Sequence, residues 1–337
     1  LRIGQAKNEE GQTGVTVLLF DKPAIGGVDI SGGGPASRET PLLSPLTASN
    51  PIDAIVLSGG SAYGLDASTG VMQYLEEHGR GYETGFAKVP LVCQSCIYDL
   101  GYGSAKIRPN AALGYAACVD AEDEKEPLQG NEGAGTGATV GKLFGMAQAE
   151  KSGIGMAAVQ IGELKVAAVV VVNALGDIFC ASNGEKIAGL FNKERNAYLD
   201  TFAEFIKITK PTDFYKENTT IGAVVTNGKF AQDEMNKIAS MTRCAYARNI
   251  NPVGTLADGD TIYAISMGDV KADINMVGTT AAKVMSMAIE NAIKYNHPEG
   301  WVKITLNADH KFFYVDVSDS GIGIPEECKD QVFERFY

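Results

Sequence analysis

Hydrophobic positions in the first half of the chain fall into short runs separated by glycine-rich turns. The runs at 14–20 and 53–60 predict strands, and the second run ends in a tight glycine turn. We expect Ser61 to cap the amino end of a helix, because its hydroxyl precedes a segment with an apolar face. Gly79 is expected to end this helix. The apolar face carries Leu65, Val71, Met72 and Leu75.

The second half contains a longer apolar run at 165–179, which predicts a strand covered on both faces. A helix is expected near 198–208, then a strand at 221–227. The next helix presents one apolar face, made of Met235, Ile238, Met241 and Ala245. A loop and strand at 251–266 and a helix at 277–293 follow. Strands with helices grouped around them favour an α+β fold in layers over a repeating βαβ unit.

Composition is typical of a soluble globular protein, since 45% of the 337 residues are hydrophobic and 21% are charged. The formal net charge of −12 argues against a nucleic-acid or anionic-membrane partner, because both favour a basic surface. The strongly apolar run at 166–172 is too short to cross a bilayer. No signal peptide is visible, so we expect a cytoplasmic protein.

Cysteine and histidine residues give no metal-binding pattern. Cys93 and Cys96 form a CxxC pair, but a zinc site of this kind needs a second pair. Buried thiols in a reducing compartment are the favoured interpretation, with a redox role as the alternative. The histidines are scattered, without ligand partners or a Ser–His pair: His78, His297 and His310.

The stretch GAGTGATVGKLFG at 133–145 superficially resembles a phosphate-binding loop. That motif needs a glycine five positions before the Gly-Lys pair, and Ser or Thr after it. Thr136 occupies the first of these positions and Leu143 the last, so the match fails twice. We expect a glycine turn leading into a helix, with Lys142 directed into a pocket or into solvent.

The segment KENTTIGAVVTNG at 216–228 places two hydroxyl residues at the start of a buried strand. From this segment alone, ordinary strand residues are the favoured interpretation, because β-branched Thr suits a pleated surface. A cut before Thr219 would instead give it a free amine beside its own hydroxyl. Those two groups form a self-contained nucleophile and base. Thr220 is a rival nucleophile by chemistry alone.

Several motifs together resemble one known family. In order they are TGVTV, GGGPASRET, DAIVLSGGSAYGLDA, GAGTGATVGK, VVVVNALGD, NTTIGAVVTN and DGDTIYAIS. Over residues 1–290 the chain resembles the L-aminopeptidase/D-esterase DmpA family, and within it the Thr-nucleophile nylon-oligomer (6-aminohexanoate-oligomer) endohydrolases. The resemblance implies an αββα sandwich like the Ntn-hydrolase fold. It also implies a precursor that cleaves itself into two associated chains and hydrolyses amide bonds.

The resemblance also assigns the reacting groups. The implied cut lies between Asn218 and Thr219, which leaves Thr219 as the nucleophile. Its α-amine acts as the base, because such amines ordinarily have a pKa of about 7.7–8.0. Asp258 and Asp260 match the pair of residues that contact the nucleophile, here through charge-assisted hydrogen bonds. Asn173 matches an asparagine that lines the oxyanion site.

Two further pocket residues, Lys142 and Tyr98, match the family motifs. Each group also has an ordinary structural interpretation: Asp-Gly-Asp is common turn chemistry, Asn173 ends a strand, Lys142 suits a helix surface and Tyr98 suits a core. One position departs from the aminopeptidase members. Where they carry a glutamate that receives the substrate's ammonium group, this chain has Cys96.

That departure favours an amidase acting on an uncharged or internal amide, with a small peptide or amide oligomer as substrate. The resemblance implies a homo-oligomer of processed units and no cofactor. No nucleic-acid or membrane partner is expected. An uncleaved, inactive relative remains an alternative.

The tail carries a second resemblance. ENAIKYN (290–296), DVSDSGIGIP (316–325) and FERFY (333–337) resemble three boxes of a sensor histidine-kinase ATPase domain. The resemblance would place Asn291 at the metal and three residues at the adenine: Asp319, Gly321 and Gly323. The lid and the next glycine-rich box are absent, so the ATP site is incomplete.

We therefore expect three parts: 1–218 and 219–290 as the two halves of the hydrolase, and 291–337 as a foreign, truncated α/β fragment. A nucleotide-binding kinase fragment is the alternative function.

Overall fold

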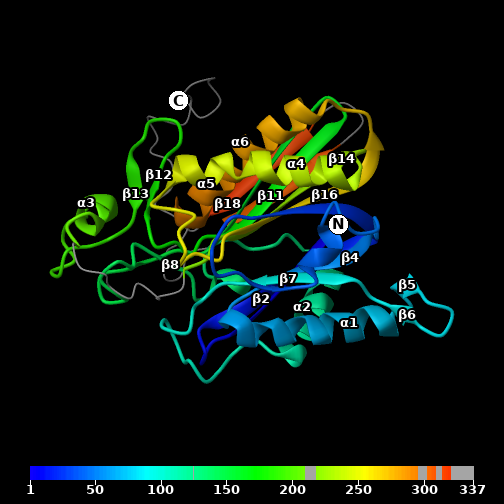
Figure 1. The fold of residues 1–337 in the computed structure, drawn as a ribbon, viewed down its shortest axis with the longest axis horizontal. Helices are drawn as coiled ribbons and strands as arrows, with labels where there is room; N and C mark the ends of the chain where they lie inside the picture. The colour runs from blue at the N-terminus through cyan, green and yellow to red at the C-terminus, as the bar shows by residue number, and fades with distance from the viewer. Residues whose placement is uncertain (124, 209–217, 295–301, 309–312, 320–337) are drawn as a thin grey trace.

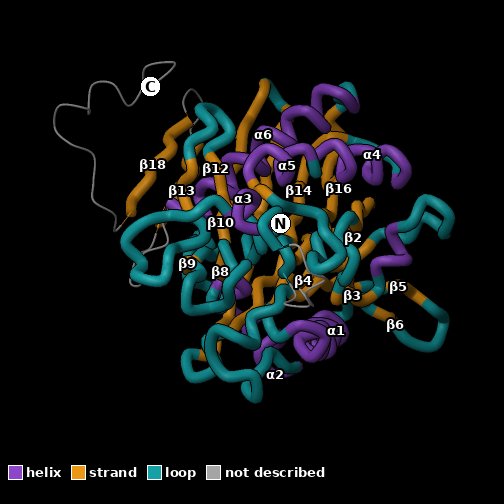
Figure 2. The backbone as a smooth tube through the Cα atoms, turned by 60° about the vertical axis from the view of Figure 1, so that its left-hand side comes forward, coloured by secondary structure: helices purple, strands orange, loops and turns teal. Residues whose placement is uncertain are grey.

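The computed structural model describes residues 1–123, 125–208, 218–294, 302–308 and 313–319. Two layers of β-strands lie between two layers of helices, and the views in Figures 1 and 2 agree on this arrangement. Buried apolar side chains fill the space between each pair of successive layers. The predicted αββα sandwich is confirmed.

One long strand, β2 (Thr13–Ile30), joins the two inner layers. Its first part pairs antiparallel with β1 (Arg2–Asn8) and β4 (Ile52–Ser58). Its last part pairs antiparallel with β16 (Thr261–Val270). The register with β4 shifts midway along β2, where the strand passes from one layer to the other.

Each inner layer extends away from β2. The first continues from β4 through β7 (Val92–Cys96) to β3 (Ala36–Arg38). The second contains β10 (Ile154–Ile161), β11 (Leu164–Val171) and β14 (Ile221–Gly228), in the order β10-β11-β14-β16. β14 and β16 are parallel, so their amino-terminal ends lie at one edge of the layer.

The helices cover the two outer faces. α1 (Ala67–Glu77) and α2 (Ala111–Asp120) lie against the first layer. α4 (Gln232–Thr242), α5 (Cys244–Asn249) and α6 (Ile274–Lys294) lie against the second, as Figure 1 shows. β11 has buried side chains on both faces, as predicted, because α6 covers one face and the first inner layer covers the other.

Shorter elements connect this framework. They are the 3₁₀ helices Thr40–Leu43, Ser61–Asp66, Ala121–Asp123 and Gly133–Gly135, the helix α3 (Thr201–Phe205), and the strands β5 (Tyr82–Glu83), β6 (Lys88–Val89), β8 (Thr139–Val140), β9 (Glu150–Lys151), β12 (Asp177–Phe179), β13 (Lys186–Ala188) and β15 (Ile250–Asn251). In the tail, β17 (Val302–Ala308) pairs antiparallel with β18 (Phe313–Asp319). Among the residues described, no helix is long and apolar enough to span a membrane.

Three local predictions were wrong. Ser61 does not cap α1, because it has a positive φ of 52° and opens a 3₁₀ helix, so that Asp66 occupies the cap position. The helix expected through Ala245 is divided into α4 and α5. No helix follows Lys142, since that segment forms turns stabilised by backbone bonds such as Gly145 N–H to the Lys142 carbonyl (2.8 Å).

α6 belongs to the hydrolase core as far as its last described turns. Gly155 of β10 lies so close to it that an added Cβ would come within 2.0 Å of the Ala288 carbonyl oxygen. Ala292 is fully buried. The Asn291 side chain, which the kinase resemblance would direct at a metal, donates to the Met156 carbonyl oxygen at 2.8 Å. The helix therefore packs on β10 across the expected boundary at 290.

We expect Asn291→Ala to lower the free energy of unfolding by about 1 kcal/mol, because a partly buried carbonyl of β10 loses its donor. Chemical denaturation of this variant measures the loss. Asn275→Ala is the matched control, since Asn275 is exposed on the same helix. Equal stability of the two variants, or stabilisation of the parent chain by Mg-ATP, would contradict this assignment of α6.

Candidate active site

Thr219 lies two residues before the start of β14, at the edge where β14 and β16 both begin. Asn218 forms a parallel bridge with Asp258, and its N–H donates to the Ala257 carbonyl at 2.9 Å. The Thr219 N–H donates to the Asn173 carbonyl oxygen at 3.0 Å. Both Asn218 and Thr219 are buried, with exposed fractions of 0% and 4%. The peptide bond between them is therefore held on both sides by neighbouring backbone.

The carbonyl oxygen of Asn218 receives two hydrogen bonds. The Thr219 hydroxyl donates to it at 2.6 Å, and the Gly259 N–H donates to it at 2.7 Å. Gly259 is a glycine for a spatial reason, because an added Cβ would lie 2.7 Å from Thr219 Oγ1. A hydroxyl thus lies beside the carbonyl group of the preceding residue, and a backbone donor polarises that carbonyl.

The turn that carries Gly259 also carries the two predicted carboxylates. Asp260 accepts the Thr220 N–H at 2.7 Å and the Gly254 N–H at 3.2 Å. Asp258 accepts the Thr255 N–H at 2.6 Å. These bonds leave both carboxylates anchored by backbone beside the Asn218–Thr219 bond.

A glycine-rich loop, residues 31–34, wraps around this turn. The Gly34 N–H donates to the Asp258 carbonyl at 2.9 Å, and the Ser31 N–H donates to the Asp260 carbonyl at 3.1 Å. An added Cβ on Gly32 would come within 2.3 Å of the turn's backbone. The GGGPASRET motif therefore supports the turn through close backbone contact.

Burial shifts the pKa of three groups at this site. Burial raises the pKa of Asp260 to about 7, and the neighbouring Asp258 contributes to this rise. Burial also raises the pKa of Asp258. Burial lowers the pKa of Lys142 to about 7, although the charges of Asp258, Asp99 and Asp260 oppose this change. The site therefore contains one acid, Asp260, and one amine, Lys142, whose protonation is sensitive to pH near neutrality.

Lys142 and Asn173 form one hydrogen-bonded unit. Lys142 Nζ donates to the Asn173 carbonyl oxygen at 2.9 Å and to Asn173 Oδ1 at 2.8 Å. The Thr139 N–H also donates to Asn173 Oδ1, at 3.1 Å. Asn173 Nδ2 donates to the Tyr98 carbonyl oxygen at 2.9 Å. Since Thr219 N–H shares the Asn173 carbonyl with Lys142, the amine of Lys142 lies close to the nitrogen of the Asn218–Thr219 bond.

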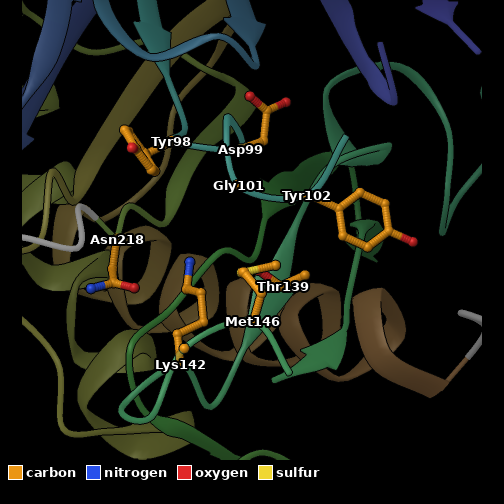
Figure 3. A pocket seen from close by; sticks show the side chains of 9 residues that line it. Tyr98, Asp99, Gly101, Tyr102, Thr139, Lys142, Met146 and Asn218 are labelled. Carbon is orange, nitrogen blue, oxygen red and sulfur yellow. The ribbon is translucent and has the colours of Figure 1, made fainter. Parts of the chain in front are cut away.

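A cavity of about 230 Å³, the Tyr98 pocket, opens onto this unit. Its walls include Tyr98, Asp99, Tyr102, Thr139, Lys142, Met146 and Asn218. Figure 3 shows the Lys142 amine extending between Asn218 and Met146 toward the space below Tyr98, while the Tyr102 hydroxyl points away. The structure thus brings together Thr219, Asn218, Asn173, the Asp pair, Lys142 and Tyr98 from segments far apart in the sequence.

Two groups at the site escaped the sequence-based prediction. One is the Gly259 N–H, because backbone donors leave no residue signature. The other is Asp99, which accepts from Thr13 Oγ1 at 2.5 Å and from the Gly60 N–H at 2.7 Å. Burial raises the pKa of Asp99. Its position next to Tyr98 was the signal that could have identified it.

Cys96, which occupies the position of the expected glutamate, is buried and does not line the pocket. Its thiol is 3.0 Å from Ser58 Oγ, and burial raises the pKa of Cys96 to about 12. Of the ATP-site residues, Asn291 bonds to β10, and Asp319 ends β18. Gly321 and Gly323 lie outside the described residues, as do His297 and His310.

Two layers of strands between two layers of helices are the fold of Ntn-type hydrolases, and this chain has that fold. The chain belongs to peptidase family S58, whose family model matches residues 1–298. The predicted DmpA-type relationship is confirmed. A second family model, for histidine kinase-, DNA gyrase B- and HSP90-like ATPases, matches residues 277–337, so the predicted likeness of the tail is also confirmed.

Relatives and solved structures agree with this family. The chain is 38% identical to an uncharacterized aminopeptidase of Mycobacterium leprae, over 77% of this chain and 72% of that protein. It is 33% identical to the 6-aminohexanoate-oligomer endohydrolase of Kocuria sp., over 87% and 83%. A β-aminopeptidase structure from Burkholderia sp. covers 86% of this chain and 83% of its own, with a TM-score of 0.63 and 18% identity. An L-aminopeptidase D-Ala-esterase/amidase from Ochrobactrum anthropi, reported as a variant of the Ntn-hydrolase fold, gives the same coverage, a TM-score of 0.62 and 15% identity.

Proposed function

We propose that the chain is a self-processing N-terminal-threonine hydrolase, cut between Asn218 and Thr219. The observation that supports this most directly is the Asn218 carbonyl oxygen, which accepts both the Thr219 hydroxyl and the Gly259 N–H. The nucleophile and an oxyanion donor are therefore already placed at the bond to be cut.

In the proposed cleavage, Thr219 Oγ1 forms a bond to the Asn218 carbonyl carbon and gives up its proton to a base. The C–N bond then breaks, and the Thr219 nitrogen leaves with a proton as an amine. Water hydrolyses the resulting ester, which yields the Asn218 carboxylate and restores the Thr219 hydroxyl. The freed amine then serves as the base toward an external amide.

Lys142 is the base that we assign to the uncut chain, in which Thr219 has no free amine. A neutral lysine keeps both of its hydrogen bonds to Asn173 and still has a lone pair for the Thr219 proton. The Asn173 carbonyl oxygen holds the Thr219 nitrogen before the cut and its amine afterwards.

The remaining predicted residues receive supporting roles. Asn173 Nδ2 donates one of its two hydrogens to the Tyr98 carbonyl oxygen. We assign the second hydrogen to the substrate's oxyanion. Asp260 accepts a hydrogen bond from the Thr220 N–H, and Asp258 forms a backbone bridge with Asn218. We therefore assign to both aspartates the orientation of the nucleophile. We assign Tyr98 to the wall that receives the substrate.

Thr220 is the weaker nucleophile candidate. It shares the parity of Gly222, where an added Cβ would face Met285 and Tyr246 in the α4–α6 layer. Thr219 shares the parity of Ile221, whose side chain packs between the two sheets, so the two hydroxyls leave the strand on opposite sides.

For the substrate we propose an internal or uncharged amide of a peptide or small amide oligomer. The buried Cys96 supplies no counter-charge, and two donors already engage Asp99. We further propose a cytoplasmic homo-oligomer of processed units, in which 1–218 and the segment from 219 to the end of α6 form the hydrolase and the tail after α6 is an appended fragment. The described cysteines are free thiols, which fits a reducing compartment. Light scattering of the processed protein tests the oligomer.

We expect self-cleavage to accelerate as pH rises through about 7. Burial holds the pKa of Lys142 near this value, so the amine is protonated below it and able to accept a proton above it. Lys142→Arg keeps a positive charge that cannot be lost, and it should remove cleavage at every pH. Fragment formation followed by mass spectrometry across pH measures both effects. Equal cleavage by Lys142→Arg and the parent chain would exclude Lys142 as the base.

Intact-protein mass spectrometry tests the proposed function itself. Fragments that end at Asn218 and begin at Thr219 are the expected result. A single full-length mass after prolonged incubation would leave the alternative of an uncleaved, inactive relative.

A further inference from the structure

A second cavity, the rear cavity, reaches Asp260 from the side of the helices. Its volume is about 400 Å³, and its walls include Ser31, Ser240, Arg243, Tyr246, Gly254 and Asp260. It shares none of its lining residues with the Tyr98 pocket. Asp260 therefore contributes to a wall that is separate from the proposed substrate site, while its Oδ1 accepts the Thr220 N–H next to Thr219.

Among the buried hydroxyls on this side that have no hydrogen-bond partner among the described residues, two lie near Asp260. One is Tyr246 Oη on α5, whose residue is 1% exposed, and the other is Thr220 Oγ1, whose residue is 0% exposed. A buried hydroxyl without a partner costs about 1–3 kcal/mol. Groups of this kind are normally satisfied by ordered water when the site is polar and roomy enough. Tyr246 and Asp260 both line the rear cavity, which is roomy enough to hold such water.

The charged groups around Asp260 come from several elements. Asp258 lies on its own turn, Lys142 on the loop after β8, and Arg243 between α4 and α5. Arg243 Nε is 3.7 Å from Asp29 Oδ1 of β2, so its charge is partly neutralised. Tyr246 is the neutral donor in this set. Burial raises the pKa of its hydroxyl, and the charge of Asp260 adds to this rise. The phenol therefore stays protonated and able to donate.

We propose that Tyr246 is a positioning residue that controls the protonation of Asp260 through water held in the rear cavity. The inference rests on the proposed role of Asp260 beside Thr219. A hydrogen bond donated to a carboxylate favours its ionised form, whether directly or through one water molecule. The rear cavity then lets Asp260 exchange its proton with solvent while substrate fills the Tyr98 pocket.

The first test titrates Asp260 directly in the uncut Thr219→Ala chain. The infrared carbonyl band of protonated Asp260, identified by its loss in Asp260→Asn, is followed across pH with and without Tyr246→Phe. We expect Tyr246→Phe to move this titration to higher pH by roughly one unit, because the ionised form loses a donor. An unchanged midpoint would overturn the proposal.

Tyr263→Phe is the matched control. Tyr263 is fully buried like Tyr246, but its hydroxyl bonds to Ser95 Oγ at 2.7 Å between the two sheets. We expect Tyr263→Phe to leave the pH midpoint of the Asp260 titration unchanged. An equal shift in both variants would show a general loss of packing and would also overturn the proposal. Because the readout is the carboxyl band, it is independent of whether Thr219 is the nucleophile.

The second test fills the rear cavity from outside. Cys244 is exposed and lines the cavity mouth, so a bulky methanethiosulfonate attaches there in the chain with native Tyr246. We expect the label to shift the Asp260 midpoint in the same direction as Tyr246→Phe, since it displaces water. Cys244→Ser should prevent the shift. A label that shifts the midpoint equally with and without Cys244, or not at all, would contradict the water link.

Discussion

Thr219→Ala is expected to leave the chain as one uncut polypeptide without amide-hydrolase activity. The substitution removes the hydroxyl that donates to the Asn218 carbonyl oxygen at 2.6 Å, and with it the atom that would attack. Loss of a nucleophile lowers turnover by several orders of magnitude, on the order of 10⁶-fold in well-studied hydrolases. Intact mass and the release of amine from a small amide substrate measure the two losses.

Two companion variants make this result specific. Thr219→Ser keeps a hydroxyl at the same position and is expected to retain cleavage at Asn218. Thr220→Ala removes the rival hydroxyl, which has no partner among the described residues on the helix side of β14, and is expected to cleave like the parent chain. Cleavage in Thr219→Ala, or its loss in Thr220→Ala, would move the nucleophile away from Thr219.

The layered fold was predictable because hydrophobic periodicity reports which faces are covered. The apolar run at 165–179 indicated a strand buried on both faces, and β11 packs against α6 on one face and against the other inner layer on the opposite face. Helix boundaries were less predictable, since Ser61 supplies a plausible cap in sequence but has a left-handed backbone in the fold. Such conformations depend on tertiary contacts that no local pattern contains.

The candidate site was predictable to the extent that it is made of side chains in recognisable motifs. Thr219, Asn173 and the Asp258–Asp260 pair were predicted in this way, and the structure places them within one hydrogen-bonded region. The Gly259 N–H and the Tyr246 hydroxyl were not found. A backbone donor has no side-chain signature, and a tyrosine on an apolar helix face resembles any core residue.

Gly259→Ala is the second variant for which we expect a large effect, because Gly259 serves the site through both its N–H and its lack of a side chain. The new Cβ would lie 2.7 Å from Thr219 Oγ1 and 2.9 Å from the Gly34 carbonyl oxygen. Either the hydroxyl or the turn must move. Movement of the turn also lengthens the 2.7 Å bond from the Gly259 N–H to the Asn218 carbonyl. Removing one oxyanion donor costs about 10²–10³ in rate, so we expect self-cleavage to slow by at least this factor.

Gly34→Ala is the control, because it shows whether any glycine-to-alanine substitution in this cluster slows self-cleavage. Gly34 lies in the same cluster, but the nearest atoms to its added Cβ are 3.8 Å away, which is ordinary contact. We expect this variant to cleave at the parent rate, and both variants to remain folded in a thermal melt. If Gly259→Ala cleaves as fast as Gly34→Ala, the Gly259 N–H is not the oxyanion donor. The Asn218 carbonyl would then be activated by the second Nδ2 hydrogen of Asn173, which would give one donor to both the self-cleavage and the external reaction.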